Sequence, residues 1–132
     1  MTIREITIVD YEKLIPFWQA NYFVNDMDSK DRLALFLEKN PDLSLLAEDS
    51  GKIVGSILGS FDGRRGYIQK LVVARECRKK GLGKQLVESV LEKLKALGTT
   101  YIPLSVEKEN VHFYQTCGFN QTTQVPMNIE LK

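Results

Sequence analysis

The chain has 132 residues, enough for one compact domain spanning 1–132 and too few for a second folded unit. With 43% hydrophobic and 27% charged residues, its composition is that of a folded globular protein and excludes a disordered one. The formal charge of +1 gives no general attraction to nucleic acid or membranes, so any basic site must be local.

The sequence has no signal for export or membrane insertion. Its N-terminus lacks the basic head and apolar run of a secretory signal, and no apolar segment approaches the roughly 20 residues that span a bilayer. We therefore expect a cytoplasmic protein with no membrane partner. Cys77, Cys117 and the single His112 have neither metal-ligand nor disulfide spacing, so we expect no metal.

The first forty residues predict a strand and two helices. Residues 2–9 alternate loosely between isoleucine and polar residues, which is typical of a strand. A helix should follow with Asp10 as its N-cap, and Pro16 should keep this helix short or kinked. Residues 29–41 predict a second helix that is capped by Ser29.

The centre of the chain predicts three strands. Residues 43–49 and 52–61 have the pattern of a hairpin around a Ser-Gly turn, and Gly55 and Gly59 leave room beside the second arm. The turn "DGRRG" leads into a strand at 67–74. The continuous apolar end "LVV" of this strand predicts burial on both faces, near the middle of the sheet.

The second half alternates helices with strands. Apolar residues from 81 to 97 recur at helical spacing, and Gly98 follows as a stop. We expect a strand at 100–106, a short helix at 110–117 ended by Gly118, and a terminal strand or hairpin arm at 125–132. This layout predicts an α+β (mixed α/β) fold around one core.

The segment "RKKGLGK" at 78–84 combines four cations with two glycines, directly between the strand at 67–74 and the long helix. A helix N-terminus offers unpaired N–H groups and a positive dipole end, which together bind phosphate. The spacing excludes a Walker A loop, because Arg78 stands at the first glycine position and Gln85 at the Ser/Thr position. It also excludes the dinucleotide fingerprint, because Leu86 replaces the third glycine.

The remaining pattern, "RKKGLG", resembles the R-x-x-G-x-G/A signature of the GNAT acetyltransferase superfamily, and "HFYQTCGF" resembles that family's C-terminal F-Y-x-x-x-G-F motif. The resemblance covers residues 2–120 in element order. It implies a central, mostly antiparallel mixed sheet, splayed between strands 4 and 5 and flanked by about four helices. It also implies an N-acetyltransferase that moves the acetyl group of acetyl-CoA directly to a primary amine.

Carried over residue by residue, the resemblance assigns both ends of a coenzyme A site. Tyr114 matches the tyrosine that donates a proton to the departing thiolate, a role that suits a phenol protonated at neutral pH. A strand amide near Val72 would hold the oxyanion. The backbone groups expected to bind pantetheine are those of Leu71, Val72 and Val73, and those expected to bind pyrophosphate belong to Arg78, Lys79, Lys80, Gly81, Leu82, Gly83 and Lys84.

Two positions depart from the family pattern. Many members place a glutamate on strand 4 as the general base, and here that position is Gln69. Our candidate base is Glu107, with Asp26 and Glu109 as alternatives. Asn110 lies only four residues before the tyrosine, so it either contacts the coenzyme or caps the helix.

Other functions and residues stay open at this level. Without a glutamate at 69, the chain could instead be an acyl-CoA sensor that binds without catalysis, whereas a nucleic-acid patch is disfavoured because no aromatic residues are interleaved with the cations. We expect Trp18 in the core and Tyr22 in an acceptor pocket, and Cys77 beside the cations could be a reactive thiol. The amine acceptor is not encoded in these motifs, and the chain could act as a monomer or a homodimer.

Overall fold

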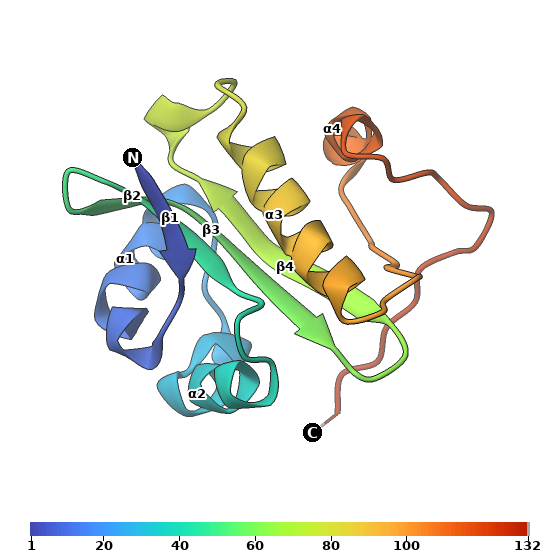
Figure 1. Ribbon diagram of the computed structural model, residues 1–132, viewed down its shortest axis with the longest axis horizontal. Coiled ribbons are helices and arrows are strands. Elements are labelled where there is room, and N and C mark those ends of the chain that lie inside the picture. The colour runs from blue at the N-terminus through green and yellow to red at the C-terminus, as the bar shows by residue number, and fades with distance from the viewer. Residues whose placement is uncertain (132) are drawn as a thin grey trace.

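A four-stranded antiparallel sheet with the order β1-β2-β3-β4 forms the centre of the computed structural model, which describes residues 1–131 (Figure 1). The strands are β1 (Thr2–Glu5), β2 (Leu45–Asp49), β3 (Lys52–Phe61) and β4 (Gly66–Val73). The helices are α1 (Tyr11–Asn21), α2 (Lys30–Lys39), α3 (Leu82–Ala96) and α4 (Val111–Thr116). None of these helices is long and apolar enough to cross a membrane.

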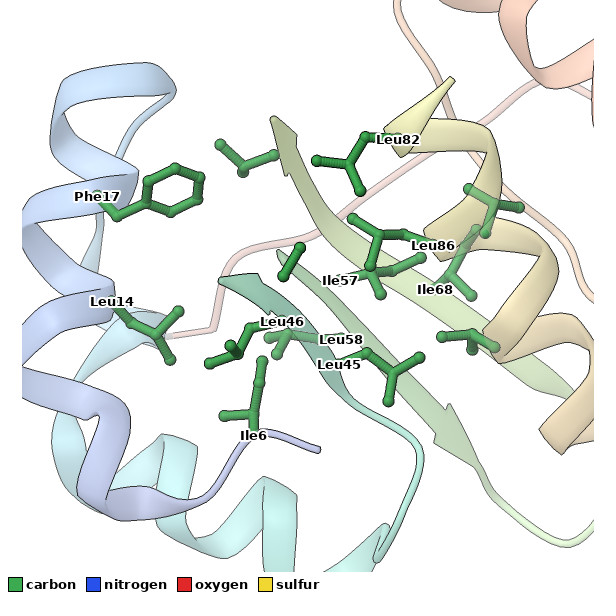
Figure 2. Packing of buried hydrophobic residues seen from close by; sticks show 14 of the residues in the cluster. Ile6, Leu14, Phe17, Leu45, Leu46, Ile57, Leu58, Ile68, Leu82 and Leu86 are labelled. Atoms are coloured by element: carbon green, nitrogen blue, oxygen red, sulfur yellow. The ribbon is translucent and has the colours of Figure 1, made fainter. Parts of the chain in front are cut away.

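The core lies on both faces of this sheet (Figure 2). Leu82, Leu86, Val90 and Leu94 recur every four residues on α3, and this buried stripe packs against β3 and β4. Helix α1 covers the opposite face with Leu14 and Phe17, both labelled in Figure 2, and its Trp18 is buried as well. The prediction that Trp18 is a core residue is confirmed: it is fully buried, and its indole Nε1 donates to Ser56 Oγ at 2.8 Å.

Gly59 allows the elements around β3 to approach closely. A Cβ atom at this position would lie 2.4 Å from the Leu43 carbonyl oxygen and 2.8 Å from Val90 Cγ1. A Cβ atom this close to a backbone carbonyl would clash, and the clash could be relieved only by moving β3 away from its neighbours. The expectation that a glycine here leaves room for packing is therefore confirmed.

Most predicted elements are confirmed. The hairpin of β2 and β3 turns at Ser50 and Gly51, and Ser29 caps α2 by accepting from Arg32 N at 3.3 Å. The left-handed φ of Gly98, +88°, follows the end of α3. Pro16 lies inside α1 without ending it, since that helix runs on to Asn21.

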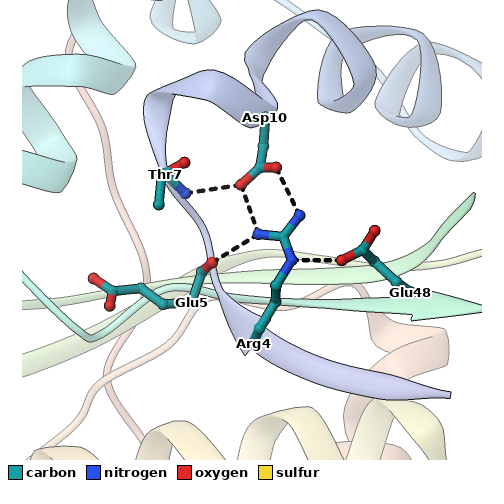
Figure 3. Close-up of polar contacts among 5 residues, drawn as sticks. All are labelled: Arg4, Glu5, Thr7, Asp10 and Glu48. Carbon is teal, nitrogen blue, oxygen red and sulfur yellow. Dashed lines mark hydrogen bonds and ion pairs between the residues drawn. The ribbon is translucent and has the colours of Figure 1, made fainter. Parts of the chain in front are cut away.

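The first strand is shorter than predicted, because the chain leaves the sheet after Glu5 to build a polar cluster (Figure 3). Asp10 does stand at the start of α1, but its carboxylate caps no amide of that helix. It accepts instead from Thr7 N at 2.8 Å and from two Arg4 nitrogens at 2.8 and 3.0 Å. The Arg4 guanidinium also donates to Glu48 and holds the pKa of Asp10 below its ordinary value. This cluster joins β1, β2 and α1.

Two predicted strands are wrong for the described residues. Residues 100–106 and 125–131 have no regular strand pairing, and residue 132 lies outside the described chain. Pro103 and Pro126 fall inside these segments, and proline cannot donate to a sheet ladder. Consequently β4 is an edge strand of the described sheet rather than a central one. Only Val72 of "LVV" is fully buried.

Candidate active site

A cavity of about 480 Å³ opens where β4 ends and α3 begins. One wall is the end of β4, the floor is the loop into α3, and the opposite wall is α4, which stands apart from the sheet (Figure 1). Asn21, the last residue of α1, and Tyr22 after it close the remaining side. The lining residues are Asn21, Tyr22, Leu71, Val72, Val73, Cys77, Arg78, Lys79, Gly81, Gly83, Lys84, Asn110, Phe113 and Tyr114.

This cavity brings together most of the predicted site residues, from segments some thirty residues apart. Three members of the predicted set do not line it. Leu82 is buried in the core at 5% exposure, and Lys80 and Glu107 are exposed elsewhere. Tyr22, expected in a pocket, does line the cavity.

The open edge of β4 forms the long wall. Gly66 N donates to Tyr101 O at 3.0 Å, and beyond this bond the chain from 100 to 106 does not pair with β4 in the described structure. An extended ligand arm therefore has backbone beside it at Leu71 and Val72. Val73 O is already used, because it accepts from the Arg78 guanidinium.

The loop into α3 has the geometry of an anion cradle. Gly81 adopts φ +86° and starts the helix, so the amides of Leu82, Gly83 and Lys84 have no acceptor within the helix and lie at its positive end. A Cβ on Gly81 would meet nothing within 4 Å, so this glycine serves the turn. A Cβ on Gly83 would lie 3.3 Å from the Phe113 ring, so this glycine lets α4 approach.

The Arg78 side chain makes structural contacts that the sequence motif does not indicate. Its Nε donates to Val73 O and its Nη2 to Asn21 O, both at 3.1 Å, so the guanidinium ties β4 to the end of α1. The other lining cations are Lys79 and Lys84. Asn21 was missed by sequence reasoning. Its Oδ1 accepts from Arg75 N at 3.1 Å, and no motif marks it.

Tyr114 is held in the cavity wall by neighbouring aromatic rings. Phe113 and Phe119 pack edge-on against it, with centroid distances of 5.0 and 5.8 Å. Burial raises the pKa of Tyr114, and the nearby Cys117, Tyr22 and Tyr67 act in the same direction. The hydroxyl is therefore protonated at neutral pH and can donate a proton.

Of the remaining polar candidates, Asn110 lines the cavity and the others do not. It stands at the N-cap of α4, but its side chain makes no capping hydrogen bond there. Gln69 is exposed on β4. Across residues 1–131, no Asp or Glu lines this cavity, so the structure brings none of Glu107, Asp26 or Glu109 to it. Glu107 as the base stays a prediction.

Comparison with known proteins gives one consistent result. The model of the acetyltransferase (GNAT) family matches residues 10–119. An acetyltransferase of Photorhabdus laumondii is 35% identical over 111 residues, 83% of this chain and 78% of that protein. One of Pectobacterium atrosepticum is 33% identical over the same share of this chain and 79% of its own.

Solved structures agree on the fold. Glucosamine-6-phosphate N-acetyltransferase from Arabidopsis thaliana matches with a TM-score of 0.71 and 27% identity, over 98% of each chain. Ard1 from Thermoplasma volcanium matches with a TM-score of 0.79 and 23% identity, over 92% of this chain and 84% of that one. The chain belongs to the GNAT acetyltransferase family, which confirms the predicted α+β fold class and family.

Proposed function

We propose that this chain is an N-acetyltransferase that moves the acetyl group of acetyl-CoA directly to a primary amine. The observation that carries the proposal is the single cavity that joins the amide cradle at the start of α3 to the protonated phenol of Tyr114. The name of the Arabidopsis relative, an N-acetyltransferase, supports nitrogen as the acceptor atom.

The cavity residues would divide the work of binding. Amides of residues 82–84 hold the pyrophosphate, with Lys79 and Lys84 adding charge from the loop. The open edge of β4 at Leu71 and Val72 pairs with the pantetheine arm as a neighbouring strand would. Asn110 contributes a side-chain contact from α4.

The reaction is a direct transfer with two proton movements. The amine nitrogen attacks the thioester carbonyl carbon, and a β4 amide near Val72 stabilises the oxyanion. The carbon–sulfur bond then breaks, and Tyr114 gives its proton to the thiolate. The amine loses its proton to water, and a proton from water restores the Tyr114 hydroxyl, so acetyl-CoA and the amine become an N-substituted acetamide and free coenzyme A thiol. An amine with a pKa of about 10.4 must first lose its charge, a cost of about 5 kcal/mol at pH 7.

A calorimetric titration tests the binding half of this proposal. Acetyl-CoA should bind the wild-type chain at one site per chain. The dissociation constant should fall in the range typical of substrates, about 1 μM to 1 mM. Absence of binding at millimolar acetyl-CoA would remove the basis for both the cradle and the catalytic role.

One observation supports a second candidate, an acyl-CoA sensor that binds without turnover. No carboxylate among residues 1–131 lines the cavity, and Gln69 cannot accept a proton. A sensor would bind acetyl-CoA and release no thiol with any amine. Thiol release with a panel of amines therefore separates the two functions.

A further inference from the structure

Lys70 lies in a bulge of β4. Between the paired positions Ser56–Val72 and Leu58–Gln69, β4 has one more residue than β3, and this bulge includes Lys70. Its φ is +52°, in the left-handed region that non-glycine residues rarely adopt. Its carbonyl oxygen accepts from Ser56 Oγ at 3.1 Å, which leaves the side chain directed toward α1.

The ammonium group of Lys70 is almost completely enclosed. Its Nζ lies 2.9 Å from Asp28 Oδ2 and donates to the Phe23 carbonyl oxygen at 2.7 Å. The side chains of Lys70 and Asp28 are only 9% and 7% exposed. The rings of Phe23, Trp18 and Tyr22 surround the ammonium, with centroids 4.3, 4.9 and 5.4 Å from Nζ.

Both partners of the ammonium belong to the connection between α1 and α2, residues 22–29. Asp28 is itself fixed, since its Oδ2 accepts from Asn25 N at 3.0 Å and its carbonyl accepts from the Tyr11 hydroxyl at 2.8 Å. Lys70 thus attaches this connection to β4 at two points five residues apart. A buried ion pair is a poor source of net stability, and the best-attested use of buried ionic groups is to specify one arrangement of the segments that they join.

The arrangement specified here lies at the reactive end of the cavity. In the proposed function the pyrophosphate lies after the end of β4, so the pantetheine arm runs back from Val73 to Leu71. The thioester then falls beside Leu71, between residue 70 and the amide near Val72 that holds the oxyanion. Tyr22, next to Phe23 in the connection, lines the cavity there and is 56% exposed.

We propose that Lys70 is a positioning residue for the amine acceptor, because its ammonium fixes the 22–29 connection against β4 and so sets the place of Tyr22 at the thioester. This proposal rests on the proposed function. It assigns Lys70 no contact with the reacting atoms. Removing the Lys70 ammonium should raise KM for the amine and leave the affinity for the coenzyme unchanged.

The test compares four variants with wild type. Lys70→Met removes the charge, and Lys70→Arg keeps a donor that can reach the same partners. The double variant Asp28→Asn with Lys70→Met avoids leaving a buried carboxylate unpaired and so preserves folding. Lys95→Met, at an exposed lysine of α3, is the matched control. The measurements are coenzyme A binding by calorimetry, hydrogen exchange at residues 22–28, and KM for both substrates with the best amine of the panel.

In Lys70→Met and in the double variant, amides of 22–28 should exchange at least about 10-fold faster than in wild type. KM for the amine should rise about 10-fold, while KM for acetyl-CoA and coenzyme A affinity stay within about 2-fold. Lys70→Arg should restore most of the slow exchange and of the low KM for the amine. Lys95→Met should change neither quantity.

Unchanged exchange in both variants would overturn the proposal, and so would a parallel loss of amine and coenzyme binding, which marks a general structural defect. Failure of wild type to bind coenzyme A would instead overturn the proposed function, and the acceptor role with it. The exchange measurement reports on the attachment in either case.

Discussion

Tyr114 is the residue on which the proposed chemistry depends most. Its ring is fixed edge-on by Phe113 and Phe119, and its pKa is raised above the ordinary value of 10.0, chiefly by burial. A phenol in this state keeps its proton at neutral pH and can release it to a thiolate whose conjugate acid has a pKa of about 8.5. The residue therefore suits a general acid and not a base.

Replacing Tyr114 by Phe should separate chemistry from binding. The ring packing is retained and only the proton donor is lost, so we expect kcat to fall about 100-fold or more, within the range of general-acid effects. The Kd for acetyl-CoA should stay within about 3-fold. Thiol release and calorimetry measure the two quantities.

Tyr101→Phe is the matched control, because Tyr101 is exposed and does not line the cavity. This variant should keep wild-type kcat. An equal loss of turnover and affinity in Tyr114→Phe would mean that Tyr114 supports the cavity wall and does not donate the proton.

At the level of elements, the local signals that predicted the fold correctly are those that depend on few neighbours. Ser29 caps α2, Gly98 follows α3, and the spacing of apolar residues on α3 marks its buried face. Each of these depends on backbone geometry or periodicity within one segment, which the sequence contains directly.

The failures have a different physical origin. The segment at 100–106 has strand composition, but Pro103 removes a ladder donor and the segment leaves β4 after one hydrogen bond. Asp10 has the residue type of a cap, but Arg4 on β1 binds its carboxylate instead. The role of Arg78 and the Lys70–Asp28 pair likewise depend on residues far along the chain. Such tertiary competition is not visible in a local pattern.

The packing of β3 gives a prediction at the same scale. Gly59→Ala should lower the free energy of unfolding by about 3 kcal/mol, because the new Cβ would overlap backbone at Leu43 and force β3 to move. Gly51→Ala is the control. It has φ +78° in open space, so it should cost only about 1 kcal/mol from backbone strain.

Urea unfolding curves measure both free energies. Equal costs for the two substitutions would show that the close approach of β3 to its neighbours is not a constraint on stability. A larger cost for Gly51→Ala than for Gly59→Ala would contradict the prediction that close packing at Gly59 matters more for stability than the turn conformation at Gly51.

For the molecule as a whole, the Arg4–Asp10 cluster predicts how stability depends on pH. The pKa of Asp10 is lowered from 3.8, first by the hydrogen bonds from Arg4. Its contribution is therefore fully present above pH 3.8 and is lost as pH falls through the lowered value. Asp10→Asn should reduce the free energy of unfolding by about 2 kcal/mol at pH 7.

This difference between wild type and Asp10→Asn should shrink as the pH falls below 3.8 and through the lowered pKa of Asp10, because the carboxylate is then protonated and uncharged like the amide. Glu12→Gln is the control, since Glu12 forms only an exposed pair with Lys30 and should change stability little. Thermal unfolding at a series of pH values, from pH 7 to acid, measures the free energy of unfolding of the three proteins. A difference that stays constant over this range would show that the Asp10 charge does not stabilise the cluster.

In the proposed function, one cavity binds acetyl-CoA and delivers its acetyl group to an amine, with Tyr114 as the general acid. The most direct measurement is thiol release from acetyl-CoA with a panel of small amines, amino acids, polyamines and peptides, for wild type and Tyr114→Phe side by side. We expect amine-dependent thiol release by wild type and a loss of about 100-fold in its rate in the variant. Amine-dependent release that is equal in the two proteins, or bound acetyl-CoA with no release for any amine, would contradict the proposed function.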